Sequence, residues 1–124
     1  MRRALRWSSV LVYAAALTML LVRPLPEVPL PLFPHADKLA HFVAFGLLGA
    51  LLLRAMTAPR LAQPARWAFV SGLSISIVYA VLMEFVQGRV GREFSILDMV
   101  AGALGVVIVT WSWARLRTRL LLVR

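Results

Sequence analysis

The chain has 124 residues, of which 61% are hydrophobic and 15% are charged, and it contains no cysteine. A soluble domain of this size is about half apolar and about a quarter charged, so the composition indicates an integral membrane protein. The lack of cysteine excludes a disulfide framework, a thiol nucleophile and a cysteine-based metal site. The net charge of +9 does not indicate nucleic-acid binding, because the basic residues lie between apolar runs and not on one continuous face.

Four apolar spans predict an all-α membrane protein, a small single-domain bundle of four transmembrane helices. The runs lack the alternation of a membrane β-barrel. The predicted helices cover residues 7–22, 37–53, 67–87 and 95–114, and a basic tail covers 115–124. A crossing needs about 20 residues, so the first two spans are short and require interfacial residues or thinner lipid.

The first span has two interpretations. Its basic start, "MRRALR", followed by a short apolar core, is typical of a cleaved signal peptide. The small residues Ala14–Ala16 lie inside the apolar core, however, and the sequence after the core reads "VRPLPEVPLP". We therefore expect an uncleaved first helix.

The basic residues predict the orientation of the bundle, because cytoplasmic loops are enriched in lysine and arginine. Ten of the fourteen basic residues lie in the N-terminal segment, the second connection and the tail, which four spans place on one side. We therefore expect a multi-pass protein of the cell membrane with both termini in the cytoplasm. The acidic residues then all fall on the outer, periplasmic or extracellular, side: Glu27, Asp37, Glu84, Glu93 and Asp98.

Small residues predict which helices pack closely. Gly46-x-x-x-Ala50 in the second span and Ala101-x-x-x-Gly105 in the fourth are small-xxx-small patterns, which allow backbones to approach. We expect the second, third and fourth spans to pack tightly and the first, which has no ionisable residue in its core, to lie at the edge.

Three ionisable residues from three helices are predicted to meet near the outer end of the bundle. His41, Glu84 and Asp98 each lie about one turn inside a helix end, roughly 4–6 Å deep. Arg89 and Arg92 follow in the short connection just above them. Glu84 is the strongest functional candidate, because a carboxylate in an apolar run near a helix C-terminus is unfavourable unless it is protonated, paired or hydrated.

Each residue also has a structural interpretation. Asp37 suits the start of a helix, and Lys38 can extend to the interface. The sequence "SILD" at 95–98 resembles a capping box, and Glu84 can tie helices together. His41 beside two carboxylates is a candidate acid, base or metal ligand, but no second histidine is well placed, so we expect no metal and no cofactor.

The same residues carry a resemblance to a known family. "DKLAHFVAFGLLG" followed by "YAVLMEFVQGRVGREFSILDMVAGALGV" resembles the VanZ-like family of bacterial membrane proteins, over residues 37–105. The family's positions fall on Asp37, Lys38, His41, Phe42, Phe45, Glu84, Gln87, Arg92, Ser95, Asp98 and Gly102 or Gly105. The family often has asparagine where this chain reads Ala101-Gly102, and Arg89 is a second candidate for the arginine.

The resemblance implies a protein of the bacterial inner membrane and cell envelope. The family's namesake is associated with low-level teicoplanin resistance. That property is not carried over to this chain as its activity.

Three functions are compatible with the sequence. In the first, which we expect, an outer-leaflet pocket binds the headgroup of an anionic lipid or a cell-wall precursor. In the second, a membrane enzyme acts on a lipid-linked phosphate, with His41, Glu84 and Asp98 as candidate catalytic residues. In the third, the cluster is structural or linked to proton binding. The expected binding residues are Asp37, Lys38, His41, Glu84, Gln87, Arg89, Arg92, Ser95 and Asp98. The expected partners are membrane lipids and no nucleic acid, and the sequence does not predict an oligomeric state.

Overall fold

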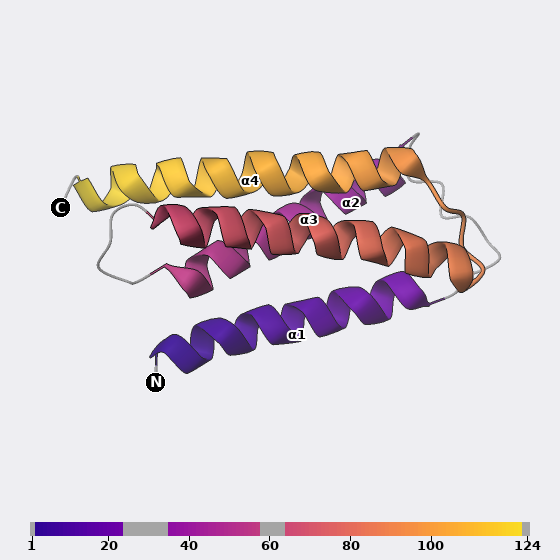
Figure 1. Ribbon diagram of the computed structural model, residues 1–124, viewed down its shortest axis with the longest axis horizontal. Coiled ribbons are helices and arrows are strands. Elements are labelled where there is room, and N and C mark those ends of the chain that lie inside the picture. The colour runs from indigo at the N-terminus through magenta and orange to yellow at the C-terminus, as the bar shows by residue number, and fades with distance from the viewer. Residues whose placement is uncertain (1, 24–34, 58–63, 123–124) are drawn as a thin grey trace.

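The computed structural model describes residues 2–23, 35–57 and 64–122, and in these ranges the chain is helical with no strand. The four helices are α1 (Arg2–Val22), α2 (Ala36–Met56), α3 (Arg66–Arg89) and α4 (Ile96–Leu122), as Figure 1 shows. Each is long and apolar enough to cross a membrane. The predicted all-α architecture of four membrane-spanning helices is therefore confirmed.

The helices extend beyond the predicted spans. The helices α1 and α2 each have 21 residues, so the interfacial residues needed to complete a crossing are part of the helices themselves. The helix α4 continues past residue 114 through the predicted basic tail. Residues 115–122 are leucine, arginine and threonine without glycine or proline, so nothing in their sequence ends the helix. The hydropathy of the sequence therefore located the end of the apolar span near residue 114, but the helix itself continues to Leu122.

The bundle has α1 at its edge. In Figure 1, α1 and α4 lie on opposite sides with α2 and α3 between them. Within the described ranges, α1 packs on α2 and α3 and not on α4, in agreement with the prediction, and α2 is the most buried helix. The first turn of α1 and the last turn of α4 lie at the same end of the bundle, so the basic segments that they carry share one end.

Glycine allows α2 and α4 to pack with their backbones nearly in contact. A Cβ added to Gly105 would overlap the backbone carbonyl oxygen of Phe42, and a Cβ added to Gly46 would lie 2.8 Å from the carbonyl oxygen of Gly105. Neither position has room for a side chain, because real Cβ atoms do not approach other atoms this closely. The helices can therefore adopt this separation only while both positions remain glycine.

The small residue of α4 that packs against Phe45 is Gly102 and not Ala101 of the predicted pattern. Ala101 is only half-buried, whereas a Cβ on its neighbour Gly102 would lie 2.8 Å from the ring of Phe45. Phe45 is 1% exposed, and its ring packs against those of His41 and Tyr79. The second glycine of α4 thus accommodates the aromatic side chain at the centre of the core.

Polar bonds to backbone carbonyls attach α1 to its neighbours. The Arg6 Nη1 donates to the carbonyl oxygens of Arg54 and Thr57, at 3.2 and 2.9 Å, and so caps the C-terminus of α2. Tyr13 donates its hydroxyl to Ala44 O at 3.0 Å. These bonds complement the burial of Val10, Leu17 and Leu21 on the inner face of α1.

The close packing of α2 on α4 predicts that Gly105→Ala lowers stability. The added methyl group overlaps the Phe42 carbonyl, and we expect a loss of about 1–3 kcal/mol, measured as a lower Tm in detergent. Gly72→Ala is the matched control, because its nearest neighbour would lie at an ordinary 3.6 Å. Equal Tm values for the two variants would contradict the packing described here.

The predicted orientation can be tested with single cysteines, because the chain has none of its own. Glu93 and Arg119 are exposed at opposite ends of the bundle. In right-side-out spheroplasts, we expect a membrane-impermeant maleimide to label Glu93→Cys at once. We expect the same reagent to label Arg119→Cys only after permeabilisation. The reverse pattern would place both termini outside.

Candidate functional site

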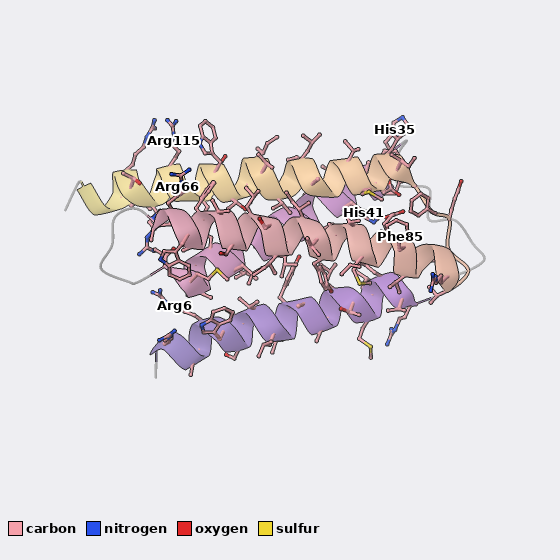
Figure 2. All side chains as sticks on the ribbon, viewed as in Figure 1. Arg6, His35, His41, Arg66, Phe85 and Arg115 are labelled. Carbon is pink, nitrogen blue, oxygen red and sulfur yellow. The ribbon has the colours of Figure 1, made fainter. Side chains whose placement is uncertain are left out.

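The polar residues predicted to meet lie at the end of the bundle away from the basic helix ends. Figure 2 places His41 and Phe85 at one end and Arg6, Arg66 and Arg115 at the other. The site is built from the first turns of α2, the last turns of α3, the connection to α4 and the first turn of α4. These helix ends bring backbone groups as well as side chains to the site.

Glu84 is the most buried ionisable residue of the site, at 1% exposed. Its Oε1 accepts the backbone N–H of Ser95 at 2.6 Å, and its Oε2 lies 3.7 Å from His41 Nε2. A carboxylate near the C-terminus of α3 is disfavoured by that helix, but here it faces the N-terminus of α4, where unpaired N–H groups favour negative charge. The sequence offers Arg89, Arg92 and His41 as possible partners for Glu84, and the structure places His41 beside it.

The N-terminus of α4 is capped by Ser95 just before it and by Glu84 of α3. Ser95 Oγ accepts the backbone N–H of Asp98 at 3.3 Å, which is the predicted N-cap bond. In a complete capping box, the third residue of the helix would return a bond to the Ser95 N–H. Glu84 of α3 takes that N–H instead, so the predicted box is only half formed within its own segment. The carboxylate of Asp98 is left to pair elsewhere.

His41 faces acceptors on both sides of its ring. Its Nδ1 donates to the carbonyl oxygen of Asp37 at 2.9 Å, and its Nε2 lies 3.4 Å from Gln87 Oε1 and 3.7 Å from Glu84 Oε2. A carbonyl oxygen only accepts, so Nδ1 carries a proton. The Nε2 atom on the other side of the ring faces side-chain oxygens of α3, so the imidazole links α2 to α3.

Lys38 joins α2 to α4. Its Nζ lies 2.8 Å from Asp37 Oδ2 and 3.2 Å from Asp98 Oδ1. Its interpretation as an interfacial anchor is therefore incomplete, because it forms ion pairs with both carboxylates. Asp98 reaches the site through Lys38 and Ser95, and in the part of the chain that the structure describes it forms no ion pair with His41. The predicted meeting of three residues thus consists of a direct contact between two of them and an indirect link to the third.

The end of α1 also belongs to the site. Leu21 O, in the last turn of α1, accepts bonds from Gln87 Nε2 at 3.4 Å and from Arg92 Nη1 at 3.3 Å. The Arg92 N–H in turn donates to Gln87 O at 3.0 Å, where the chain reverses through Gly91 at φ 84°. Sequence reasoning missed Leu21, because a carbonyl group at a helix end has no signature in the side chain.

A cavity of about 280 Å³ opens above this network. All the predicted binding residues line it except Glu84, which lies beneath His41, and Arg89, which is exposed. Glu93 and Phe94 complete the lining, and Phe94 is held by a ring contact with Phe85 at 5.4 Å between centroids. Sequence reasoning did not include Glu93 and Phe94. The signal that could have found them is their position between Arg92 and Ser95, which were both predicted.

The charges around the cavity are unevenly paired. Lys38 is matched by two aspartates, whereas Arg92 forms no ion pair with any described residue. The described residues contain no group of three or more histidine, aspartate or glutamate side chains arranged to hold a metal ion. The cavity therefore offers one arginine whose charge is not neutralised within the described structure.

The sequence that builds this site matches one known family. A family model described as VanZ/LLP1 matches residues 4–117. The chain belongs to the VanZ/LLP1 family. The match takes in α1 and most of α4, beyond the 37–105 segment that carries the resemblance in the sequence. Searches of curated proteins and of solved structures found no match.

The buried carboxylate predicts a graded loss of stability in this VanZ/LLP1 chain. Glu84→Ala leaves the Ser95 N–H and His41 without their partner, and we expect a loss of about 2–4 kcal/mol. Glu84→Gln keeps an oxygen acceptor for the N–H, so we expect less than half of that loss. Thermal unfolding in detergent measures both.

Glu93→Ala is the control for Glu84, because it removes the same charge from an exposed position. We expect its Tm to stay close to that of the unmodified protein. A Glu84→Ala variant as stable as Glu93→Ala would show that the bond to α4 contributes nothing.

Proposed function

We propose that the cavity binds the phosphate of a lipid headgroup, from an anionic phospholipid or a lipid-linked cell-wall precursor. The observation that carries the proposal is Arg92, a guanidinium that lines the cavity and has no carboxylate partner among the described residues. Arginine binds phosphate through parallel N–H donors, and such charge-assisted bonds are stronger than neutral ones.

The position of Arg92 supports this ligand. It lies between the ends of α3 and α4, at the level where membrane-spanning helices reach the headgroup region. Its Nη1 is held by Leu21 O, which fixes the guanidinium while the bond uses only part of its five donors. An arginine held in place before binding loses less conformational entropy when the ligand arrives.

The acidic residues of the lining are partly offset by its basic residues. Asp37 and Asp98 share the ammonium of Lys38, whose single positive charge offsets one of the two carboxylates. Glu93 is exposed, and water and salt screen its charge. Arg89, which sequence reasoning included among the phosphate ligands, is exposed and outside the lining, so the proposal does not use it.

Binding has more support than acid–base catalysis. Ser95 is the hydroxyl-bearing residue among the described lining residues, and its Oγ already accepts the capping bond from Asp98. Glu84 is covered by His41 and does not line the cavity. The contact between His41 and Glu84 is better explained as a structural link between helices, whereas Arg92 is placed to bind a ligand.

Arg92→Gln should weaken binding of lipid phosphate about tenfold or more, since a hydrogen bond to a charged group contributes about 1.5–3 kcal/mol. Native mass spectrometry of the purified protein, titrated with phosphatidylglycerol in one arm and a polyprenyl phosphate in another, measures the apparent Kd. Arg89→Gln is the matched control, because it removes the same charge three residues away and outside the cavity.

The two arms distinguish the sources of the phosphate. Tighter binding of the polyprenyl phosphate would indicate a cell-wall precursor and would connect the site with the glycopeptide resistance of the family's namesake. Tighter binding of phosphatidylglycerol would indicate a membrane phospholipid. Equal affinities for Arg92→Gln and Arg89→Gln in both arms would contradict the proposal.

A further inference from the structure

A second and larger cavity, of about 510 Å³, lies at the opposite end of the bundle. It is formed by the start of α1, the C-terminus of α2 and the start of α3. Its lining includes Arg3, Arg6, Trp7, Met56, Thr57 and Trp67. The described lining of this cavity shares no residue with the headgroup site.

We propose that this second cavity binds an anionic phospholipid of the leaflet on the side of the two termini. The charge of the lining selects an anion: it contains two arginines, and none of the described residues that line it is acidic. The described acidic residues all lie at the other end of the bundle, from Asp37 to Asp98. The positive-inside rule assigns this basic end to the cytoplasm, where the membrane surface is rich in anionic lipid.

Two hydrogen bonds hold the guanidinium of Arg6 at the edge of this cavity. Its Nη1 is bonded to the carbonyl oxygens of Arg54 and Thr57 at the end of α2. A guanidinium has five N–H donors in a rigid plane, and these bonds use one nitrogen of its three. Arg6 is half-buried against the helix end, whereas Arg3, one turn earlier on α1, is exposed. The cavity thus combines an arginine that is fixed in place with a second, exposed arginine.

The apolar part of the lining fits the rest of a lipid. Trp7 and Trp67 come from α1 and α3, and tryptophan is enriched at the level of lipid headgroups. Trp67 is 63% exposed, so most of its large apolar surface is open to contact with a lipid. Met56 and the buried Ala55 add an apolar wall to the same cavity. A phosphate between the arginines would place the first part of an acyl chain along this wall.

The proposal can be tested with short-chain phosphatidylglycerol and phosphatidylcholine as probes for the full-length protein. The apparent Kd of each is measured by native mass spectrometry titration in detergent. We expect tighter binding of phosphatidylglycerol, and we expect Arg3→Gln to weaken it about fivefold, the change that about 1 kcal/mol per basic residue corresponds to. Trp67→Ala should also weaken it, without any change in charge.

Two control variants distinguish binding in this cavity from binding elsewhere on the protein. Arg119→Gln removes the same charge from the same end of the bundle but from an exposed position on α4, outside the lining. Arg92→Gln removes an arginine from the headgroup site at the other end. A loss that Arg3→Gln and Trp67→Ala cause, that Arg119→Gln does not cause, and that is equally large when Arg92→Gln is also present supports the proposal, whatever Arg92→Gln does at the first site.

Three results would overturn it. Equal losses for Arg3→Gln and Arg119→Gln would show general attraction to a basic surface. A loss with Arg92→Gln alone would assign the bound lipid to the first site. Equal affinity for phosphatidylglycerol and phosphatidylcholine would show that the cavity does not select an anion. Arg6 is left unchanged throughout, because its bonds to α2 also contribute to the fold.

Discussion

The acidic end of the bundle depends on one bond, from the backbone N–H of Ser95 to the buried carboxylate of Glu84. An unpaired carboxylate inside an apolar helix is costly, and so is a helix start without acceptors for its N–H groups. Each removes the other's unfavourable free energy. Because Glu84 accepts the Ser95 N–H, the carboxylate of Asp98 is left to pair with Lys38 on α2.

The backbone contact of α2 with α4 makes this arrangement possible. Because Gly105 and Gly46 let the two helices approach, Lys38 on α2 reaches across to Asp98 on α4. In lipid, apolar side chains gain little by facing one another, so close packing and polar bonds determine how helices associate. The glycines and the polar network therefore act together, and neither fixes the site alone.

The sequence predicted the number of helices, because four apolar runs of sufficient length have few other interpretations in a membrane protein. It also brought His41 and Glu84 together by depth alone. It grouped Asp37, Glu84 and Asp98 as partners of the basic residues without assigning the pairs, since depth says nothing about rotation around the helix axis. It missed Leu21, because a backbone carbonyl has no sequence signal. The spacing of the resemblance favoured Arg92 over Arg89, and Arg92 is the arginine that lines the cavity, beyond the reversal at Gly91.

The attachment of α1 has a mechanical consequence. Its N-terminal turns hold the end of α2 through Arg6, and its last turn holds Gln87 and Arg92 through Leu21 O. A helix of this length is a stiff rod of about 30 Å. Through these bonds α1 touches the polar groups at both ends of the bundle, so the helix at the edge is attached at two points about one membrane thickness apart.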